Sequence, residues 1–328
     1  DLSELFTAAQ AMATYLQHGA VLLVTAQVPV GTCDQIEKII REANPSVDFD
    51  IVYSPENLKL GQAIDRFKKP DMIVIGSNNT AALDEIEEFL KVIPCTKIRT
   101  NLRTAEMVKH AINAFLAVSI SFANEVANLC DEADADALTI AGILRMDSRI
   151  SPNAPLIPGL PFSGGTLARD MKVLQNLGDR VSYETPLIDG ALRVNEMQKG
   201  LVTRKLKRVY GSLDGLYIGI LGLTYKPQTS TLRRSIAIEI IRDLVTSGAS
   251  VKAYDPMADR EELRSYELEI CSNPYDVANE ADALVFVTAW PDFRTLDFKR
   301  IKASMRRPVV IDAQNALDAN LLIREGFT

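Results

Sequence analysis

The chain has 328 residues, which is enough for two or three domains, and 47% hydrophobic with 24% charged residues is typical of a soluble globular protein. A net charge of −7 argues against a nucleic-acid-binding protein, which usually shows a basic face. The four cysteines lack metal-ligand and Cys-x-x-Cys spacing, and we find no apolar run of about 18 residues that predicts a membrane span. We therefore expect reduced thiols, no metal and a cytoplasmic protein.

The first hundred residues predict part of an α/β domain. Apolar residues at helical spacing alternate with short apolar runs, and prolines bound two of these runs, as expected for buried strands. Because strands and helices alternate, we expect a parallel sheet with right-handed crossovers. The expected elements are a helix over 2–17, a strand over 20–25, a helix over 34–42, and strands over 50–53 and 72–76.

The centre of the chain predicts long helices. From Thr104 to about Cys130 apolar side chains cover most faces of one helix, which is typical of a helix buried inside a domain or against a second subunit. Residues 151–161 carry four prolines and predict a loop. Further helices are expected over 135–145, 169–177 and 186–209.

A second α/β unit follows these helices. Gly219 and Gly222 fall at the end of its first strand, but this Gly-x-x-Gly spacing falls short of a dinucleotide fingerprint. Asp255, directly before Pro256, is better explained as a turn residue than as a ribose ligand. The expected elements are a strand over 217–223, a helix over 236–247, and strands over 250–254, 283–288 and 308–312.

Polar and glycine residues gather in four short segments. In the second, Lys109 and Asn113 are four residues apart, so both side chains lie on one face of the expected helix. A lysine among apolar neighbours is either paired for structural reasons or poised near a ligand oxygen. Glu56 follows a strand at the edge where ligands bind, and is either a base acting through water or a solvated carboxylate. The segments are 54–58, 105–113, 159–170, and 222–229 with Arg233.

The third segment is a glycine-rich loop that runs into an expected helix. Ser163, Gly164 and Gly165 let the backbone approach a ligand closely, and Arg169 and Asp170 supply opposite charges just beyond. Taken alone, such a loop is more often a plain turn than a site. It gains weight from the other three segments.

The fourth segment supplies cations. Lys226 and Arg233 follow the first strand of the second α/β unit, again at the ligand edge. Exposed lysines and arginines are usually only surface charge, and Arg234 beside them fits that reading. A diphosphate nevertheless needs local cations in an acidic protein, which makes Lys226 the strongest candidate for phosphate binding.

In their order along the chain, the four segments resemble the UDP-glucose/GDP-mannose dehydrogenase family. The family's loop reads Gly-Phe-Gly-Gly-x-Cys-x-x-Lys-Asp, against Pro161 to Asp170 here. The resemblance spans nearly the whole chain, and implies an NAD-dependent oxidoreductase that acts on a nucleotide sugar such as UDP-glucose in polysaccharide biosynthesis. Shorter matches lie at 28–32, 147–150, 194–198 and 254–256.

The resemblance implies roles for single residues. Lys109 and Asn113 match the lysine and asparagine that hold the sugar oxygen as it becomes an alkoxide and then an oxyanion. Asp170 matches an aspartate that positions water or takes a proton, and Thr166 occupies the place of the nucleophile. The catalytic set is thus Lys109, Asn113, Asp170, Glu56 and Thr166; the substrate-binding set is Phe162, Gly164, Lys226 and Leu58; and the cofactor-binding set is Arg233, Gln27 and Glu56.

Five presumed site positions depart from the family's pattern. The most consequential is Thr166, which replaces the cysteine that captures the aldehyde as a thiohemiacetal. A threonine hydroxyl needs an adjacent base to attack, and neither His18 nor His110 is near it in sequence. The other departures are Gln27 for threonine, Leu60 for glutamate, Arg169 for lysine and Gln314 for arginine.

The resemblance further implies a partial N-terminal Rossmann-like domain over 1–100 that binds NAD, a central helical dimerisation domain over 101–210, and a C-terminal Rossmann-like α/β domain over 211–328 that binds the nucleotide sugar. No Gly-x-Gly-x-x-Gly turn is present and the chain opens on Asp1, so we expect a fragment that lacks about one β-α-β-α-β half of the first domain. A homodimer through the long central helix is expected.

Three functions remain open from the sequence. The first is a nucleotide-sugar dehydrogenase whose outcome is altered or reduced because Thr166 replaces the cysteine. The second is a non-catalytic homologue that binds nucleotide sugars or assembles with an active dehydrogenase. A third and weaker one is a dehydrogenase of another class, similar to 6-phosphogluconate dehydrogenases, against which the Lys226-Pro227 segment and the complete second α/β unit speak.

Overall fold

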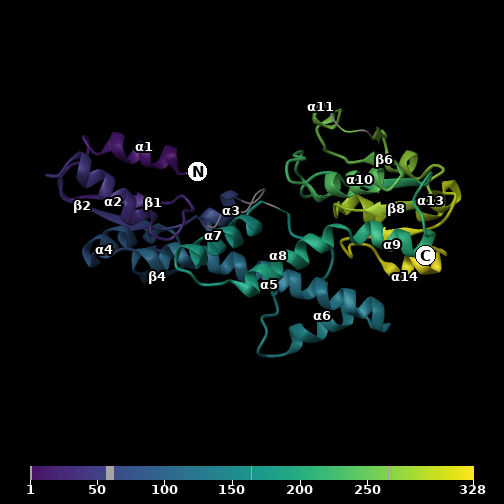
Figure 1. Cartoon of the computed structure of the whole chain (residues 1–328), viewed down its shortest axis with the longest axis horizontal. Coiled ribbons are helices and arrows are strands. Elements are labelled where there is room, and N and C mark those ends of the chain that lie inside the picture. Colours follow the sequence, from purple (N-terminus) through teal and green to yellow (C-terminus); the bar gives the residue numbers. More distant parts are fainter. Residues whose placement is uncertain (1, 57–62, 164, 265, 267) are drawn as a thin grey trace. The chain divides into compact units, whose positions relative to one another are not determined.

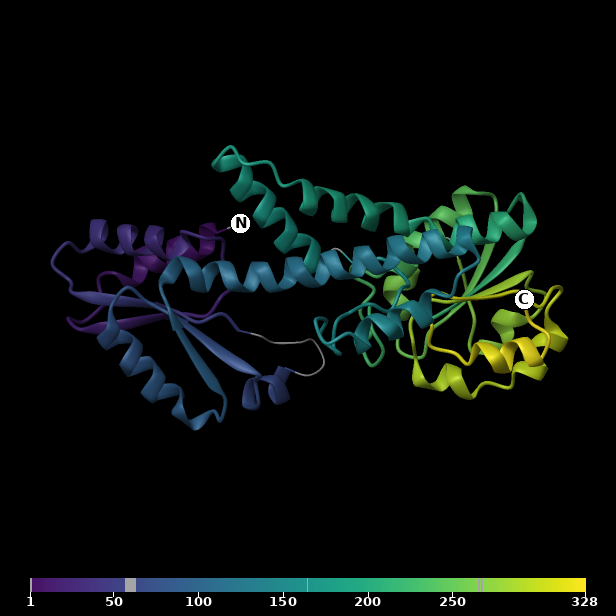
Figure 2. The same cartoon turned by 90° about the horizontal axis from the view of Figure 1, so that it is seen from below.

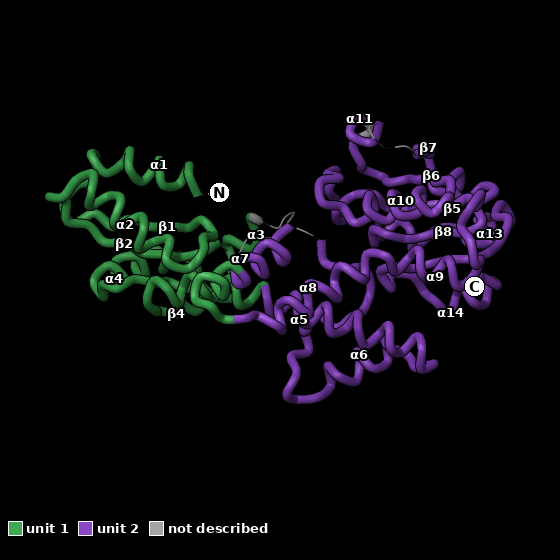
Figure 3. The backbone as a smooth tube through the Cα atoms, viewed as in Figure 1, with its two compact units in different colours: residues 1–113, 176–183 green, residues 114–175, 184–328 purple. Residues whose placement is uncertain are grey.

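The computed structural model describes residues 2–56, 63–163, 165–264, 266 and 268–328. The chain divides into two compact units, drawn in different colours in Figure 3. Unit 1 contains residues 1–113 and 176–183, and unit 2 contains residues 114–175 and 184–328. Each unit contains its own β-sheet, so the α/β fold class expected from the sequence is confirmed.

Unit 1 is a four-stranded sheet in the order β1-β2-β3-β4 with helices on both faces. On one face α1 and α2 pack on β1 and β2 together with the first turns of α5, and on the other face α4 packs on β2 and β3. The elements are α1 (Ser3–Met12), β1 (Ala20–Val24), α2 (Thr32–Ala43), β2 (Phe49–Tyr53), α3 (Ala63–Lys68), β3 (Met72–Gly76), α4 (Thr80–Phe89), the 3-10 turn η1 (Leu90–Val92) and β4 (Thr96–Thr100).

One strand pair corrects the expectation of a parallel sheet. β1 and β2 are parallel, as are β3 and β4, but β2 and β3 run antiparallel through the single pair Tyr53 and Gly76. The expectation was wrong for this pair because apolar runs indicate buried strands without indicating their direction, which the connection sets. A Cβ on Gly76 would lie 2.4 Å from the Cβ of Ala105, so a glycine is required where α5 begins beside β3.

Five helices follow unit 1's sheet. The helix expected over 186–209 is in fact two helices, which Gly200 separates, because glycine is a poor helix former and ends α8 there. In Figures 1 and 2 the second half of α5 runs beside α8, and the Ser121 hydroxyl on α5 donates to the Ala191 carbonyl on α8 at 2.8 Å. The helices are α5 (Leu102–Ala133), α6 (Ala137–Met146), α7 (Leu167–Arg180), α8 (Pro186–Lys199) and α9 (Leu201–Tyr210).

Helix α5 is long and apolar enough to cross a membrane by length and composition, although we predicted no such segment. About a third of its apolar window is buried in the described structure (33%). The core helix of a folded domain passes the same test, and α5 carries the buried polar residues Glu106, Asn113 and Asn124. We therefore assign no membrane span to it.

Unit 2 contains a five-stranded parallel sheet in the order β7-β6-β5-β8-β9, in the same doubly wound arrangement that the sequence predicts. α9 and α10 pack on one face, and α12, α13 and α14 on the other. The elements are β5 (Tyr217–Leu221), α10 (Ile236–Thr246), β6 (Ser250–Tyr254), α11 (Arg260–Leu263), β7 (Glu269–Ile270), α12 (Pro274–Ala278), β8 (Ala283–Phe286), η2 (Pro291–Thr295), α13 (Phe298–Ser304), β9 (Val310–Asp312) and α14 (Ala319–Arg324).

Candidate functional site

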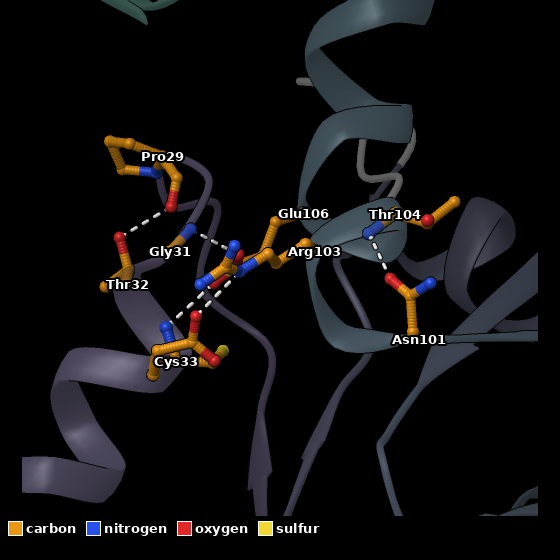
Figure 4. A network of polar contacts seen from close by, with 9 residues as sticks. Pro29, Gly31, Thr32, Cys33, Asn101, Arg103, Thr104 and Glu106 are labelled. Atoms are coloured by element: carbon orange, nitrogen blue, oxygen red, sulfur yellow. Dashed lines mark hydrogen bonds and ion pairs between the residues drawn. The ribbon is translucent and has the colours of Figure 1, made fainter. Parts of the chain in front are cut away.

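In unit 1 the buried carboxylate of Glu106 ties the start of α5 to the turn after β1. Its two oxygens accept the backbone N–H groups of Gly31 at 2.6 Å and Cys33 at 2.8 Å, where α2 begins (Figure 4). A carboxylate there satisfies helix N–H groups that lack partners within the helix and lies at the positive end of the helix dipole. The arrangement therefore fixes α5 against the 28–33 turn.

Two further contacts strengthen this junction. The ring nitrogen Nε2 of His110 lies 2.9 Å from the carbonyl oxygen of Val28, and the Arg103 guanidinium pairs with Asp34 at 2.8 Å. The Cys33 thiol is buried beside Glu106, and burial, followed by that negative charge, raises the pKa of Cys33. The thiol is therefore protonated at neutral pH, and the His110 ring contacts the same turn through Val28.

Lys109 and Asn113 share a face of α5 in the turns that follow Glu106. Lys109 is half-buried, and Asn113 is buried. Both belong to unit 1, whereas Thr166 and Asp170 belong to unit 2. The catalytic roles predicted for these four residues remain predictions.

A cavity of about 280 Å³ lies at the carboxyl ends of β1 and β2 in unit 1. Its walls are mostly apolar, with the buried Ser54 hydroxyl and the exposed Glu56 carboxylate among the polar groups. The carboxyl ends of parallel strands are where doubly wound folds bind dinucleotides, so the position and lining fit one end of NAD. Gln27 is half-buried in the turn that follows β1.

In unit 2 the glycine-rich loop lies against the segment that carries the candidate phosphate-binding cations. A Cβ built on Gly165 would lie 3.6 Å from Nη1 of Arg234 and 3.7 Å from the Tyr225 hydroxyl. The ammonium of Lys226 lies 5.3 Å from the centre of the Tyr225 ring. The structure thus brings together two of the four motifs, 159–170 and 222–234.

Arg234 has a more specific setting in the structure than the surface charge that the sequence indicates. Its backbone adopts the left-handed conformation with φ of 65°, which is uncommon for a residue with a side chain and recurs at functional sites. Among the described residues no carboxylate lies within ion-pair distance of Arg233 or Arg234. The sequence carried no signal for Arg234 beyond its place next to Arg233.

The other predicted residues of the loop differ in their surroundings. The Phe162 side chain is buried with Ala117, Met171 and Ala191, between α5, α7 and α8. Asp170 is 0% exposed on the first turn of α7, 3.7 Å from Nε of Arg169. Thr166 is exposed, and its carbonyl accepts the N–H of Asp170.

Three of the residues singled out from the sequence, Leu58, Leu60 and Gly164, lie outside the described residues. Gln314 uses its amide to bind the Val287 carbonyl at 3.1 Å, beside β8. Asp255 accepts hydrogen bonds from the backbone of Leu223 and Thr224 and from the Trp290 indole, all at 3.0 Å or less, so it holds the turn after β5, in line with the turn role favoured from the sequence.

Sequence models of one family cover most of the chain. The NAD binding domain of the UDP-glucose/GDP-mannose dehydrogenase family matches residues 1–93, the central domain 103–197 and the UDP binding domain 219–319. A UDP-glucose 6-dehydrogenase of Rhizobium meliloti (strain 1021) is 37% identical over 336 residues, covering 100% of this chain and 76% of that protein. The chain belongs to the UDP-glucose/GDP-mannose dehydrogenase family.

Two more relatives agree with this membership. UDP-glucose 6-dehydrogenase TuaD of Bacillus subtilis (strain 168) is 34% identical, with 100% of this chain and 71% of that protein covered. A UDP-glucose dehydrogenase structure from Pyrobaculum islandicum superposes with a TM-score of 0.87 at 31% identity, covering 96% of this chain and 73% of that one. The expectation of an NAD-dependent oxidoreductase of the nucleotide-sugar dehydrogenase family is confirmed.

Proposed function

We propose that the protein binds a UDP-sugar and oxidises it by a single hydride transfer, so that the product is an aldehyde or its hydrate. The observation that carries this proposal is Thr166 at the position of the family's cysteine. A cysteine with a pKa of about 8.5 offers an accessible thiolate, whereas a threonine hydroxyl needs a base. Among the described residues of unit 2, none makes a hydrogen bond to the Thr166 hydroxyl, so no side chain of this unit is in place to activate it.

The chain's own residues supply the rest of the first oxidation. NAD, when bound, is the hydride acceptor. Lys109 and Asn113 hold the oxygen of the sugar alcohol and stabilise the alkoxide that forms as its proton leaves. Glu56, exposed beside the cavity in unit 1, takes that proton through water. Asp170 then positions the water that hydrates the aldehyde, and no covalent bond to Thr166 forms.

In this proposal the cofactor and the nucleotide sugar bind to different segments of the chain. We assign residues 1–100 to NAD, with Gln27, Glu56 and Arg233 as cofactor contacts, and residues 211–328 to the UDP-sugar. Lys226 binds the diphosphate and Phe162 of the glycine-rich loop belongs to the sugar-nucleotide site, while Gly164 and Leu58, outside the described residues, keep the substrate-binding role that the resemblance implies. Matches of the family's NAD binding and UDP binding domains to 1–93 and 219–319 support this assignment.

Product analysis tests the proposed outcome. Purified protein, UDP-glucose and NAD are incubated, and products are trapped with a hydroxylamine reagent before mass spectrometry. We expect the oxime of the aldehyde, with the uronic acid as a minor and slow product. A clean conversion to the carboxylate would show that Thr166 does not stop the reaction at the first stage.

A second candidate is a non-catalytic nucleotide-sugar-binding homologue or assembly partner. The replacement of threonine by Gln27 and of glutamate by Leu60, at positions that the resemblance places around the nicotinamide, favours it. Calorimetric titration separates the two: binding of UDP-glucose without binding of NAD supports the second candidate, and binding of both supports the first.

We further propose a homodimer through α5. Phe115, Phe122 and Leu129 are spaced by seven residues on one side of this helix and are 67%, 48% and 64% exposed. Large apolar side chains gathered on one exposed face usually mark an interface. Light scattering at micromolar concentration should give the mass of a dimer, and a monomeric mass would contradict it.

Finally, we place the protein in the cytoplasm. Cys33, Cys95, Cys130 and Cys271 are all unpaired in the described structure, as is usual for proteins in a reducing compartment. Fractionation of cells that express the protein would test this placement.

A further inference from the structure

We propose that Asn195 and Gln198 on α8 are positioning residues, which hold the glycine-rich loop in the geometry that the sugar nucleotide requires. The proposal rests on the proposed function, in which this loop lies along the substrate. Both residues belong to the 194–198 segment that resembled the family, and nothing in the sequence indicated what their amides bind.

The Asn195 side chain binds both backbone groups of Phe162. Its Oδ1 accepts the Phe162 N–H at 2.8 Å, and its Nδ2 donates to the Phe162 carbonyl at 3.0 Å. Asn195 is 7% exposed, so these bonds do not compete with bulk water. Two bonds of opposite sense fix the peptide planes on both sides of Phe162, as a neighbouring β-strand would.

Gly159 is held in the same way by two helices. Its N–H donates to Oδ1 of Asn124 on α5 at 2.8 Å, and its carbonyl accepts from Nε2 of Gln198 at 2.7 Å. Oε1 of Gln198 accepts a hydrogen bond from Asn128 at 3.0 Å, which fixes the orientation of the Gln198 amide. Asn315, after β9, donates to the Pro158 carbonyl at 2.8 Å. Side-chain amides thus hold the loop backbone at Pro158, Gly159 and Phe162.

This arrangement of amides makes the contact between α5 and α8 less stable than apolar side chains would. Nδ2 of the buried Asn124 has no hydrogen-bond partner in the part of the chain that is described, and a buried donor without a partner lowers stability. Apolar side chains would join α5 to α8 without that cost. The amides are therefore best explained by the loop conformation that they impose.

The held backbone leads directly into the ligand-facing part of the loop. Ser163 follows Phe162, and Gly165 lies against Tyr225 and Arg234 of the cation-bearing segment. A rotation of the Phe162 peptide would displace the residues that lead to Thr166. Residues that orient contacting groups in this way affect ligand binding without touching the ligand.

The test compares two loop variants with a matched control. Asn195→Ala removes both bonds to Phe162, and Gln198→Met removes the bond to Gly159 with little change in side-chain volume. Ser121→Ala is the control, because its buried hydroxyl joins the same two helices through Ala191 and does not touch the loop. Urea unfolding, calorimetric Kd for UDP-glucose, and KM and kcat are measured for each.

We expect each variant to lose some stability, and Asn195→Ala to lose the most because it removes two buried hydrogen bonds. The two loop variants should weaken UDP-glucose binding and raise KM by about tenfold or more, because small displacements of a site are costly, while Ser121→Ala binds within about twofold of the original protein. Asn195→Gln, which carries the same amide on a longer stem, should not restore affinity if loop geometry is what matters.

Two failures are distinguishable. If the original protein binds UDP-glucose and the folded loop variants bind it equally well, or if Ser121→Ala weakens binding as much as they do, the positioning role is wrong and the proposed function stands. If the original protein binds neither UDP-glucose nor UDP, the proposed function fails and this role fails with it. Should Asn195→Ala not fold, Gln198→Met decides the question alone.

Discussion

Replacing Glu106 by glutamine tests how the first turns of α5 are held to the 28–33 turn within unit 1. The carboxylate is 0% exposed and accepts two backbone N–H groups, from Gly31 and Cys33. The glutamine amide keeps one oxygen that accepts a backbone N–H, but its NH2 group takes the place of the other oxygen and faces the second backbone N–H. The variant Glu106→Gln therefore loses one charge-assisted hydrogen bond and leaves a buried N–H without a partner.

The size of the effect follows from these contacts. A hydrogen bond to a charged group contributes about 1.5–3 kcal/mol, and a negative charge at a helix N-terminus adds about 0.3–1 kcal/mol. The variant regains part of the cost of burying a carboxylate. We expect the free energy of unfolding to fall by roughly 2–4 kcal/mol.

Urea unfolding followed by circular dichroism measures this change. Glu37→Gln is the control, since Glu37 lies partly exposed on α2 and pairs there with Arg41, and it should cost no more than about 0.5 kcal/mol. A loss below about 1 kcal/mol for Glu106→Gln would refute the view that its carboxylate holds α5 to the 28–33 turn.

Three other outcomes are expected. Burial raises the pKa of the Cys33 thiol above that of an unfolded thiol, so the free energy of unfolding is unaffected by this group below about pH 9. At higher pH the unfolded thiol ionises first, and the free energy of unfolding falls by up to about 1.4 kcal/mol per pH unit. Cys33→Ala should flatten the pH dependence of urea unfolding, and an unchanged slope would contradict this. Arg234→Ala should weaken UDP-glucose binding about tenfold in calorimetry if this guanidinium binds phosphate, whereas the control Arg242→Ala on α10 should leave the affinity unchanged. Equal affinities of the two variants would show that Arg234 does not bind phosphate. Thr166→Cys should increase uronic acid formation in the product assay, provided that the other departures from the family are tolerated, and its failure to do so would move the cause to those departures.

The sequence predicts the helices and strands whose apolar residues recur at regular spacing. It does not predict the direction of β3, the presence of β4 or the end of α8, for the following physical reasons. The run 72–76 indicated a buried strand, but its direction beside 49–53 depends on tertiary packing. β4 was missed because most of its residues are polar and exposed, which hides the period of a strand. Gly200 ends α8 within the range 186–209, whose pattern predicts one continuous helix.

Motifs single out part of the candidate site from the sequence, whereas only contacts define the rest. The glycine-rich loop and Lys226 stand out by their residue types and spacing, and their roles in binding remain predictions. The bonds of Glu106 to Gly31 and Cys33, and of Asn195 to Phe162, join residues 75, 73 and 33 positions apart. No local pattern specifies such partners, because glutamate and asparagine at helical positions are usually solvated.

The most direct test of the central claim is the number of NADH molecules formed per UDP-glucose consumed. Absorbance at the nicotinamide band gives the first quantity, and chromatography of the remaining UDP-glucose gives the second. A protein that cannot capture the aldehyde on residue 166 should form one NADH per sugar. Two NADH per sugar at an ordinary rate would contradict the account.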